Sequence, residues 1–345
     1  MDKLKIIYVG DDALGATSLH RARALERLGH EVTFFNPKRA VEWNRYNRFF
    51  HFHTGYVFLA RAIRRLLDSS LAPNARFDVA WVDLGDYVAP SVISTLKERC
   101  KRSVNFNLDD PTGKRDWGRW TSFRRALRHY DLCVVVRKES EVEYPIYGAK
   151  KILRVWRSAD EVAHRPREIL EGIRERWASE VAFVGTWMPE RGPFMAHLLK
   201  HGVPLTIWGD RWQKAPEWSV LRAAWRGPSL AGDDYCYAIQ CAKVSLGLLS
   251  RENRDLHTTR TAEIPFAGGL FCAQRTVEHE ELFTDGEGAF FWRDADECAK
   301  VLKRILPDAA LRARVAEAGR RRVIERGLLN ETVMLHVLGA LNDRS

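Results

Sequence analysis

The sequence lacks an apolar run of the roughly 20 residues that a membrane-spanning helix needs, and no signal-peptide core follows Met1. Its six cysteines are scattered without a CxxC spacing, which argues against both a zinc site and a disulfide framework. No low-complexity tract or short-period repeat interrupts the chain. We therefore expect a folded cytoplasmic protein with buried thiols.

Positive charge is in excess, with 55 Lys and Arg against 45 Asp and Glu and a formal net charge of +10. This balance indicates an affinity for anions such as nucleotide phosphates, acidic lipid surfaces or nucleic acid. The basic residues are spread along the chain without an RRM, KH or zinc-finger signature. We therefore expect no nucleic-acid partner.

The order of apolar runs and helical stretches predicts an α/β fold. Residues 4–9 and 32–35 read as strands on either side of a helical stretch at 18–28, which is a βαβ unit. Further strand candidates are residues 79–82, 104–107, 132–136, 181–184, 205–208, 244–248, 270–273 and 289–292. Because helical stretches separate them, we expect parallel sheets covered on both faces.

A length of 345 residues predicts about two domains. A polar, helix-favouring stretch at 158–176 is interpreted as their junction. We expect a first domain over residues 1–165, completed by a C-terminal helix at 331–345 that packs back across it, and a second domain over 166–330. Both are predicted to be Rossmann-like and doubly wound.

The turn after the first strand carries Asp11 and Asp12 ahead of a helix. Ala16 stands where a phosphate loop has its Lys, and the GxGxxG spacing is missing, so neither a P-loop nor an ordinary dinucleotide site is indicated. The two carboxylates would repel an anion and suit a hydroxyl-bearing acceptor. The alternative is a plain βα turn capped by Asp or Ser.

Asp109 and Asp110 follow the strand at 104–107 and precede Pro111. Ligands of open α/β sheets bind at the carboxyl ends of the strands, where these side chains should emerge. They can supply a general base or hold sugar hydroxyls. The alternative is a turn in which one Asp caps backbone N–H groups.

Two segments of the second half suggest a nucleotide site. Gly185 and Thr186 close a strand, and Arg191 follows, so backbone N–H groups and a guanidinium are available for a pyrophosphate. An exposed Arg in an ordinary loop is the alternative.

The second segment, residues 254–269, gathers Asp255, His257, Arg260 and Glu263 before a Gly-Gly break at Gly268. A carboxylate at such a helix can accept two hydrogen bonds from a ribose diol. The alternative there is a surface pair of Arg260 with Glu263.

Several segments resemble bacterial-type GT-B glycosyltransferases, specifically the spore-maturation CgeB-like group: KIIYVG, LGHEV, DDP, YDLCVVV, FVGT, RTAEIPFAGG and AEAGRRRV, in the family's order. The resemblance covers nearly the whole chain and is most specific over residues 260–269. It implies a GT-B fold, with two Rossmann-like doubly wound domains facing across a cleft.

The resemblance implies a transferase that moves a sugar from a UDP-, GDP- or dTDP-sugar to an unidentified protein, glycan, lipid-linked or small-molecule acceptor. Glu263 matches the carboxylate expected to bind the donor ribose, Arg260 and Thr261 lie in the same motif, and Arg191 matches a basic position near the diphosphate. The full set of expected donor-binding residues is Gly185, Thr186, Arg191, Asp255, His257, Arg260, Thr261, Glu263 and Gly268.

Two departures from the family pattern concern catalysis. Asp255 stands where related retaining enzymes carry a glutamate, and Asp109-Asp110 stands where many GT-B enzymes have a histidine. The candidate catalytic residues are therefore Asp109, Asp110 and Asp12. A non-catalytic nucleotide- or carbohydrate-binding protein on this scaffold and a nucleotide-sugar epimerase are the alternatives.

We expect no metal and no cofactor, the nucleotide-sugar being a co-substrate, because preplaced cations and backbone dipoles can stabilise the leaving diphosphate. The DxD triplet at 294–296 is interpreted as a helix cap, and His197 with His201 as a helix surface without the HExxH glutamate. Aromatic and arginine residues within 51–67 form either a plain amphipathic helix or a contact with the inner face of a membrane or a lipid-linked acceptor.

Overall fold

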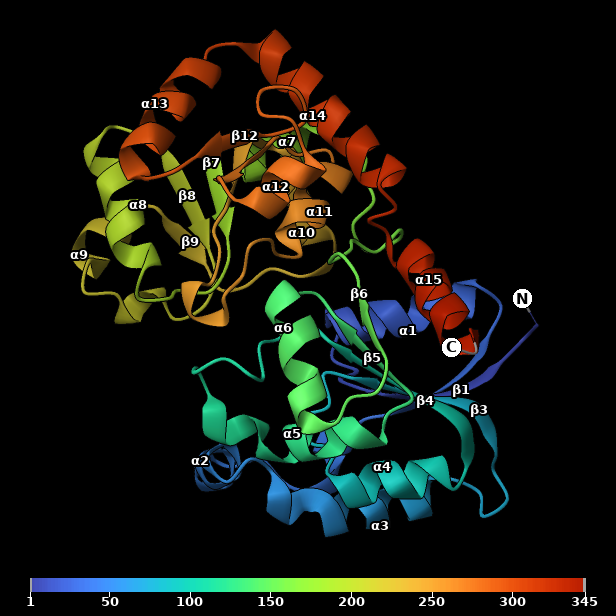
Figure 1. Ribbon diagram of the computed structural model, residues 1–345. Helices are drawn as coiled ribbons and strands as arrows, with labels where there is room; N and C mark the ends of the chain where they lie inside the picture. The colour runs from blue at the N-terminus through green and yellow to red at the C-terminus, as the bar shows by residue number, and fades with distance from the viewer. Residues whose placement is uncertain (1, 344–345) are drawn as a thin grey trace. The chain divides into compact units, whose positions relative to one another are not determined.

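Two parallel β-sheets organise the chain in a computed structural model that describes residues 2–343 (Figure 1). Unit 1 takes its described residues from 2–156, 252–254 and 330–343, and unit 2 from 157–251 and 255–329. The division after Trp156 comes earlier than the boundary expected at residue 165. The last two residues of the helix expected at 331–345 lie outside the described part.

Within the described residues, unit 1 contains a six-stranded sheet of order β2-β1-β3-β4-β5-β6, in which every neighbouring pair is parallel. Its strands are β1 (Lys5–Val9), β2 (Glu31–Phe35), β3 (Phe77–Asp83), β4 (Cys100–Asn107), β5 (Leu132–Val135) and β6 (Ile152–Arg154). Its α-helices are α1 (Thr17–Arg27), α2 (Arg45–His53), α3 (Ala60–Ser70), α4 (Pro90–Lys97), α5 (Thr121–Ala126), α6 (Lys138–Glu143) and α15 (Asn330–Asn342). Short 3₁₀ helices are η1 (Pro37–Ala40), η2 (Val57–Leu59), η3 (Trp117–Trp120), η4 (Leu127–His129) and η5 (Tyr144–Tyr147).

Strand β1 shows why both faces of this sheet are covered. Successive side chains of a strand point to opposite faces. Ile7 and Val9 pack in one core with α3, α4 and α5, whereas Ile6 and Tyr8 pack in the other with α1 and α15. Because all four are buried, β1 reads as a continuous apolar run, as expected for a parallel strand between two helix layers (Figure 1).

Within the described residues, unit 2 repeats the design with a six-stranded parallel sheet of order β12-β11-β10-β7-β8-β9. Its strands are β7 (Ser179–Val184), β8 (Leu205–Trp208), β9 (Trp225–Gly227), β10 (Ala242–Gly247), β11 (Phe271–Gln274) and β12 (Phe290–Trp292). Its α-helices are α7 (Glu171–Trp177), α8 (Arg191–Lys200), α9 (Trp218–Leu221), α10 (Gly232–Gln240), α11 (Arg260–Phe266), α12 (Val277–Leu282), α13 (Ala295–Ile305) and α14 (Ala309–Glu325). The 3₁₀ helix η6 (Trp212–Lys214) belongs to it, and η7 (Arg251–Asn253) crosses its edge.

The strand orders confirm the predicted doubly wound α/β architecture and locate its switch points. The order reverses between β1 and β3 in unit 1 and between β7 and β10 in unit 2. At such a point the two neighbouring connections leave on opposite faces of the sheet, which opens a crevice where ligands bind. A search for function therefore begins at the carboxyl ends of these four strands.

Among residues 2–343, no helix is both long enough and apolar enough to traverse a lipid bilayer.

Candidate functional site

Unit 1 has a cavity of about 310 Å³ at its switch point. It is lined by residues that follow β1, including Gly10 and Asp11, by residues 83–88 at the end of β3, and by Asp109 after β4. Lys38, at the start of η1, forms an ion pair with the Asp11 carboxylate at 2.5 Å. The cavity therefore combines apolar walls with a few charged side chains, which is the usual make-up of a small-molecule site.

A buried ion pair forms part of the cavity wall. Arg21 of α1 donates from Nε and Nη2 to the two carboxylate oxygens of Asp83, at 2.7 and 2.9 Å. The hydroxyl of Tyr8 donates to the same carboxylate at 2.6 Å. A bidentate guanidinium–carboxylate pair fixes both groups, so this part of the wall is held rigid.

Asp109 and Asp86 share one guanidinium beside the cavity. Arg119 Nη2 donates to the Asp86 carboxylate at 2.9 Å, and its Nη1 lies 3.8 Å from that of Asp109. Burial raises the pKa of Asp86, and Arg119 works against that rise. The Asp109 side chain is 37% exposed, whereas that of Asp86 is 2% exposed. Of the two, Asp109 is the carboxylate that a ligand can reach.

Asp110 has a different environment from its neighbour. Its side chain is 1% exposed, and Arg254 donates to both of its oxygens at 2.7 and 2.6 Å. Arg254 also donates to Glu143, and this hydrogen bond holds the pKa of the Glu143 carboxyl below its usual value. Asp110 further accepts a hydrogen bond from the Gly113 N–H at 3.0 Å, so its visible role is to anchor the loop.

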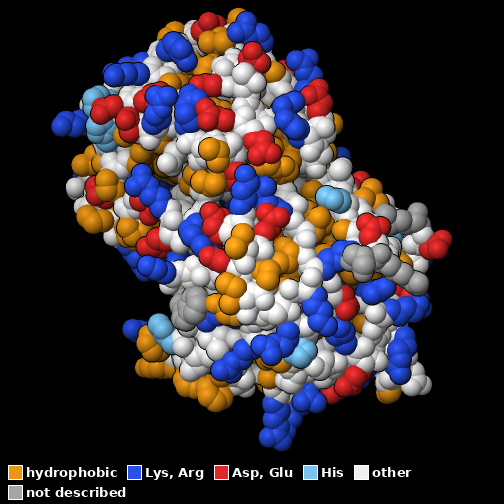
Figure 2. Space-filling model, in the orientation of Figure 1, with side chains coloured by type: hydrophobic (Ala, Val, Ile, Leu, Met, Phe, Trp, Pro, Cys, Tyr) orange, Lys and Arg blue, Asp and Glu red, His pale blue; other side chains and the backbone are white. Residues whose placement is uncertain are grey.

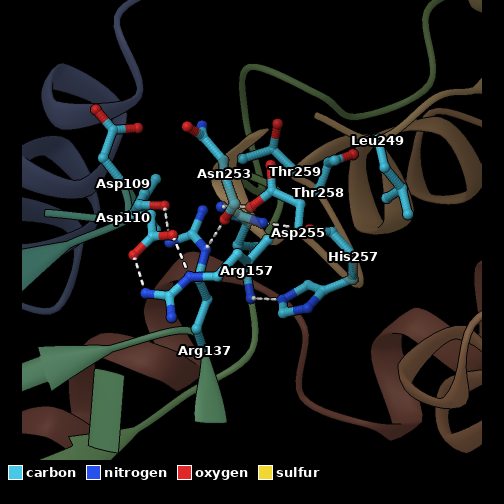
Figure 3. Close-up of polar contacts among 12 residues, drawn as sticks. Asp109, Asp110, Arg137, Arg157, Leu249, Asn253, Asp255, His257, Thr258 and Thr259 are labelled. Carbon is cyan, nitrogen blue, oxygen red and sulfur yellow. Dashed lines mark hydrogen bonds and ion pairs between the residues drawn. The ribbon is translucent and has the colours of Figure 1, made fainter. Parts of the chain in front are cut away.

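Residues 252–254 are held in unit 1 by the same loop. Arg137 donates to the carbonyl of Asn253 and to that of Leu108, both at 2.8 Å (Figure 3).

Asp12, the third predicted catalytic residue, accepts hydrogen bonds from Asn36 and Arg39. It is not among the residues that line the cavity. The structure therefore brings Asp109 to the cavity but neither Asp110 nor Asp12.

At the switch point of unit 2, Arg191 joins the loops that follow β7 and β10. Its Nη1 donates to the carbonyl of Thr186 at 2.7 Å, and its Nη2 to those of Leu248 and Leu249 at 3.2 and 3.3 Å. The residue is 7% exposed. Arg191 thus holds the backbone carbonyls of the two loops together.

The backbone approach beside Gly185 is close. Gly209 adopts φ +148°, and a Cβ there would lie 2.0 Å from the Gly185 carbonyl oxygen. Only glycine fits such an approach. The turns after β7 and β8 are therefore packed closely against each other.

Asp255 and His257 are buried in the segment that leads to α11. Arg157 Nη2 donates to Asp255 at 2.9 Å, and the Arg157 N–H donates to Nε2 of His257 at 3.1 Å (Figure 3). The Nδ1 of His257 lies 2.6 Å from the Glu278 carboxylate. Since Nε2 accepts, Nδ1 carries the proton and donates to Glu278. Burial lowers the pKa of His257 to about 4, so the ring is neutral at pH 7.

Thr261 lies in a second buried pair with a histidine. Its Oγ1 is 3.0 Å from Nε2 of His279, whose Nδ1 lies 2.6 Å from the carbonyl oxygen of Gln274. Because a carbonyl only accepts, Nδ1 of His279 is protonated and Nε2 accepts from the Thr261 hydroxyl. Burial lowers the pKa of His279 to about 4 as well. These contacts tie the start of α11 to the residues around α12.

Glu263 and Arg260 meet around Tyr235. The Tyr235 hydroxyl donates to Oε2 of Glu263 at 2.7 Å, and the Arg260 guanidinium lies 5.7 Å from the centre of the Tyr235 ring. Arg260 Nη1 is 3.9 Å from the Glu263 carboxylate, and His164 Nε2 is 3.6 Å from it. The Glu263 side chain is 5% exposed and that of Arg260 39%. Arg260 is therefore the accessible cation of the motif.

Gly268 lies at the other end of α11. It adopts φ +90° after the last helical residues, a conformation that terminates a helix. A helix of seven residues is roughly 10 Å long, so Gly268 is not grouped with Arg260.

Five residues in and around the cavity were not predicted from the sequence, namely Arg21, Lys38, Asp83, Asp86 and Arg119. For Asp83 and Asp86 a signal was present, since both follow the strand candidate at 79–82 just as Asp109 follows the next one. The basic residues come from helices and loops that carry no recognisable motif.

Comparisons with known proteins show a family match over part of the chain and a shared fold. Residues 191–334 match the family model described as Glycosyl transferase-like. No curated protein matches the sequence.

Solved structures resemble the whole chain. Sucrose-phosphate synthase from Thermosynechococcus elongatus has a TM-score of 0.70 at 14% identity, covering 98% of both chains. A glycosyltransferase from Rickettsia africae ESF-5 has a TM-score of 0.63 at 12% identity, covering 100% of both. Anabaena HepE in complex with UDP-glucose has a TM-score of 0.64 at 11% identity, covering 98% of this chain and 99% of that one. At these identities the similarity establishes the fold, and it confirms the predicted GT-B class.

Proposed function

We propose that this protein is a glycosyltransferase of the CgeB-like group that transfers a sugar from a nucleotide-sugar to an acceptor hydroxyl. The observation that carries the proposal is the cavity at the switch point of unit 1, into which Asp109 is brought, in a chain whose residues 191–334 match a glycosyl transferase-like family. The titles of similar structures name UDP-glucose and UDP as ligands of HepE. A uridine nucleotide is therefore the first donor to test.

The donor is proposed to bind unit 2 at the start of α11. Arg260 is half-buried there and supplies a cation for the diphosphate. The Tyr235 ring packs against its guanidinium, and the Tyr235 hydroxyl orients Glu263. Glu263 is assigned to the ribose hydroxyls. Asp255, His257 and Thr261 are proposed to hold the motif in place, since each is bound to a partner within unit 2.

The acceptor is proposed to enter the cavity of unit 1. Asp109 takes the proton of the acceptor hydroxyl, and that oxygen forms a bond to the anomeric carbon of the donor. The bond from this carbon to the diphosphate oxygen breaks, and the nucleoside diphosphate leaves with the electron pair. Arg260 and the backbone dipoles near Gly185 offset the developing negative charge, so the reaction is proposed to need no metal.

An exposed aromatic surface on unit 1 supports a lipid-linked acceptor or contact with an anionic membrane. No residue of α2 is buried. Four aromatic side chains there and in η2 are 50–81% exposed, namely Tyr46, Phe49, Phe50 and Phe58. Arg45 and Arg48 are exposed on the same helix. Aromatic rings flanked by arginines suit the boundary between lipid headgroups and acyl chains.

The decisive experiment is calorimetric titration with UDP, GDP, dTDP, CDP and ADP, with magnesium or with EDTA. We expect selective binding of one nucleotide that EDTA leaves unchanged. Glu263→Ala should weaken this binding about tenfold to hundredfold, because it removes hydrogen bonds to a charged acceptor. Tyr235→Phe keeps the carboxylate and removes only the hydroxyl that orients it, so it should weaken nucleotide binding less than Glu263→Ala does.

Turnover of the matching nucleotide-sugar then tests the base. Asp109→Asn should lower kcat by about 10² to 10⁴-fold, the usual contribution of general-base catalysis. Asp110→Asn should retain turnover in the folded fraction. Binding without turnover over a wide acceptor panel would instead indicate a binding protein, conversion of the donor sugar without an acceptor would indicate an epimerase, and no nucleotide binding at all would refute the donor site.

A further inference from the structure

Three side chains with metal-binding atoms converge where α8 ends and α13 begins in unit 2. His197 lies in the last turn of α8, His201 follows that helix directly, and Asp296 lies in the first turn of α13. The Nε2 atoms of His197 and His201 are 2.9 and 3.7 Å from the same Oδ1 atom of Asp296. Figure 2 shows histidine side chains beside acidic ones over this part of the unit.

The spacing of these atoms matches a transition-metal site. Two ligand atoms of a tetrahedral zinc ion lie roughly 3.3 Å apart when each bond is about 2.05 Å long. The distances from Nε2 of His197 and of His201 to Oδ1 of Asp296 fall on either side of that value. All three ligand atoms lie within 4.8 Å of one another. The histidine side chains are 34% and 40% exposed, so small rotations can bring them to bonding distance.

The backbone that carries the three ligands is fixed by the core. Met195 and Leu198 of α8 and Cys298 and Leu302 of α13 are buried in the same hydrophobic cluster. The site therefore needs no ordering of a loop to form, which is what a preorganised metal site requires.

Both sequence motifs were interpreted separately as a helix surface and a helix cap. Asp294 does cap α13, with its side chain accepting a hydrogen bond from the Glu297 N–H at 2.8 Å. Sequence spacing does not reveal that His197 and His201 lie against Asp296, because 95 residues or more separate them along the chain. Their meeting is a finding of the structure.

We propose that His197, His201 and Asp296 bind a zinc ion, with water as the fourth ligand, and that this ion fastens α8 to α13. Imidazole nitrogens favour zinc and its transition-metal neighbours, whereas magnesium and calcium prefer sites made of oxygen atoms. Lys300 lies one turn after Asp296 and adds positive charge nearby, which disfavours a cation held by charge alone. The site therefore depends on coordinate bonds from the two histidines.

The zinc site is separate from the proposed donor site. His197 lies six residues after Arg191 along α8, roughly 9 Å at the rise of an α-helix. The ion is thus a structural clip on a helix whose first residue holds the switch-point loops. It takes no part in the transfer reaction.

The test uses the full chain without an affinity tag, freed of metal with EDTA and dialysed. Calorimetry with zinc chloride should show one equivalent bound, and magnesium and calcium chloride should show none. His201→Asn and Asp296→Asn should each weaken zinc binding about tenfold or more, and zinc should raise the Tm of the wild type but not of these variants. His336→Asn, at an exposed position of α15, is the matched control and should bind zinc as the wild type does.

Equal zinc binding by wild type and His201→Asn would overturn the proposal, and so would equal binding of zinc and magnesium. Cobalt(II) added in place of zinc gives a second readout, because tetrahedral coordination produces strong visible absorption that the variants should lack. Nucleotide titration of His201→Asn distinguishes this proposal from the proposed function: loss of zinc with intact nucleotide binding separates the two sites.

Discussion

Acid should weaken unit 2 through its two buried neutral histidines. His257 and His279 each have a pKa lowered to about 4 by burial, against about 6.5 in an unfolded chain. Below pH 6.5 the unfolded state therefore binds protons that the folded state does not. Stability is complete above that pH and is lost as the pH falls toward 4.

The size of the effect follows from these values. Between pH 8 and pH 5, one histidine with this shift costs about 2 kcal/mol of unfolding free energy, and two cost about 4 kcal/mol. The variant His257→Asn has no imidazole at this position, so the part of the pH-dependent loss of unfolding free energy that is due to His257 disappears. The variant is less stable at pH 8, because its shorter side chain cannot span from Glu278 to the Arg157 N–H as the imidazole does, but its stability should fall by only about 2 kcal/mol on going to pH 5.

Urea unfolding followed by tryptophan fluorescence at pH 8, 7, 6 and 5 measures this difference. Contributions from unit 1 are common to both proteins and cancel in the comparison. The gap between wild type and His257→Asn should narrow as the pH falls. A gap that is constant from pH 8 to pH 5 would show that His257 titrates alike in the folded and unfolded states, and the reasoning from burial would be wrong.

Two further predictions concern unit 1. Arg254→Met leaves the buried Asp110 carboxylate without its ion-pair partner and should lower the unfolding free energy, measured with urea at pH 7, by about 3 kcal/mol. Glu143→Gln changes a side chain that is 29% exposed and should lower it by less than about 1 kcal/mol. Equal losses of unfolding free energy in the two variants would contradict this account. Phe49→Ser should weaken co-sedimentation with anionic lipid vesicles while Ile146→Ser, an exposed apolar position outside α2, should not, and unchanged sedimentation of the first variant would argue against the membrane surface.

The predicted strand candidates include central strands such as β1 and β7 and also the edge strands β2 and β12. Residues 6–9 and 181–184 are runs of buried or half-buried apolar side chains, and the structure places β1 and β7 there. The edge strands β6 and β9 have only three residues each and mixed burial, so they leave no periodic pattern to detect. Their pairing is supplied by the neighbouring strand.

The helix-favouring stretch at 158–176 shows a local competition. Helix α7 occupies only its end, from Glu171. Before it, the Asp160 carboxylate accepts hydrogen bonds from the N–H groups of Val162 and Ala163, and His164 accepts from the Asp160 N–H. Short polar side chains that accept hydrogen bonds from nearby backbone N–H groups compete with helix formation, and residues 158–170 are accordingly not in an α-helix.

The sequence placed Asp109 and Asp110 together at the end of a strand but did not distinguish their surroundings. The rule that ligands bind at strand carboxyl ends directed attention to Asp109 and Asp110 together. What separates them is Arg254, 144 residues away from Asp110 in the chain. Partners at such distances are set by the tertiary fold, and composition or spacing around an aspartate does not reveal them.

The C-terminal helix has a consequence for synthesis on the ribosome. Val333, Met334, Val337 and Leu338 of α15 are buried in the core that also contains Tyr8 of β1. During translation, the face of the unit 1 sheet that contains Tyr8 stays uncovered until all of unit 2 and then α15 have been synthesised. The largest hydrophobic cluster described for unit 2 contains no residue of α15. Nascent chains arrested before residue 330 should therefore expose an apolar face of the domain made first, while the domain made second is already able to fold.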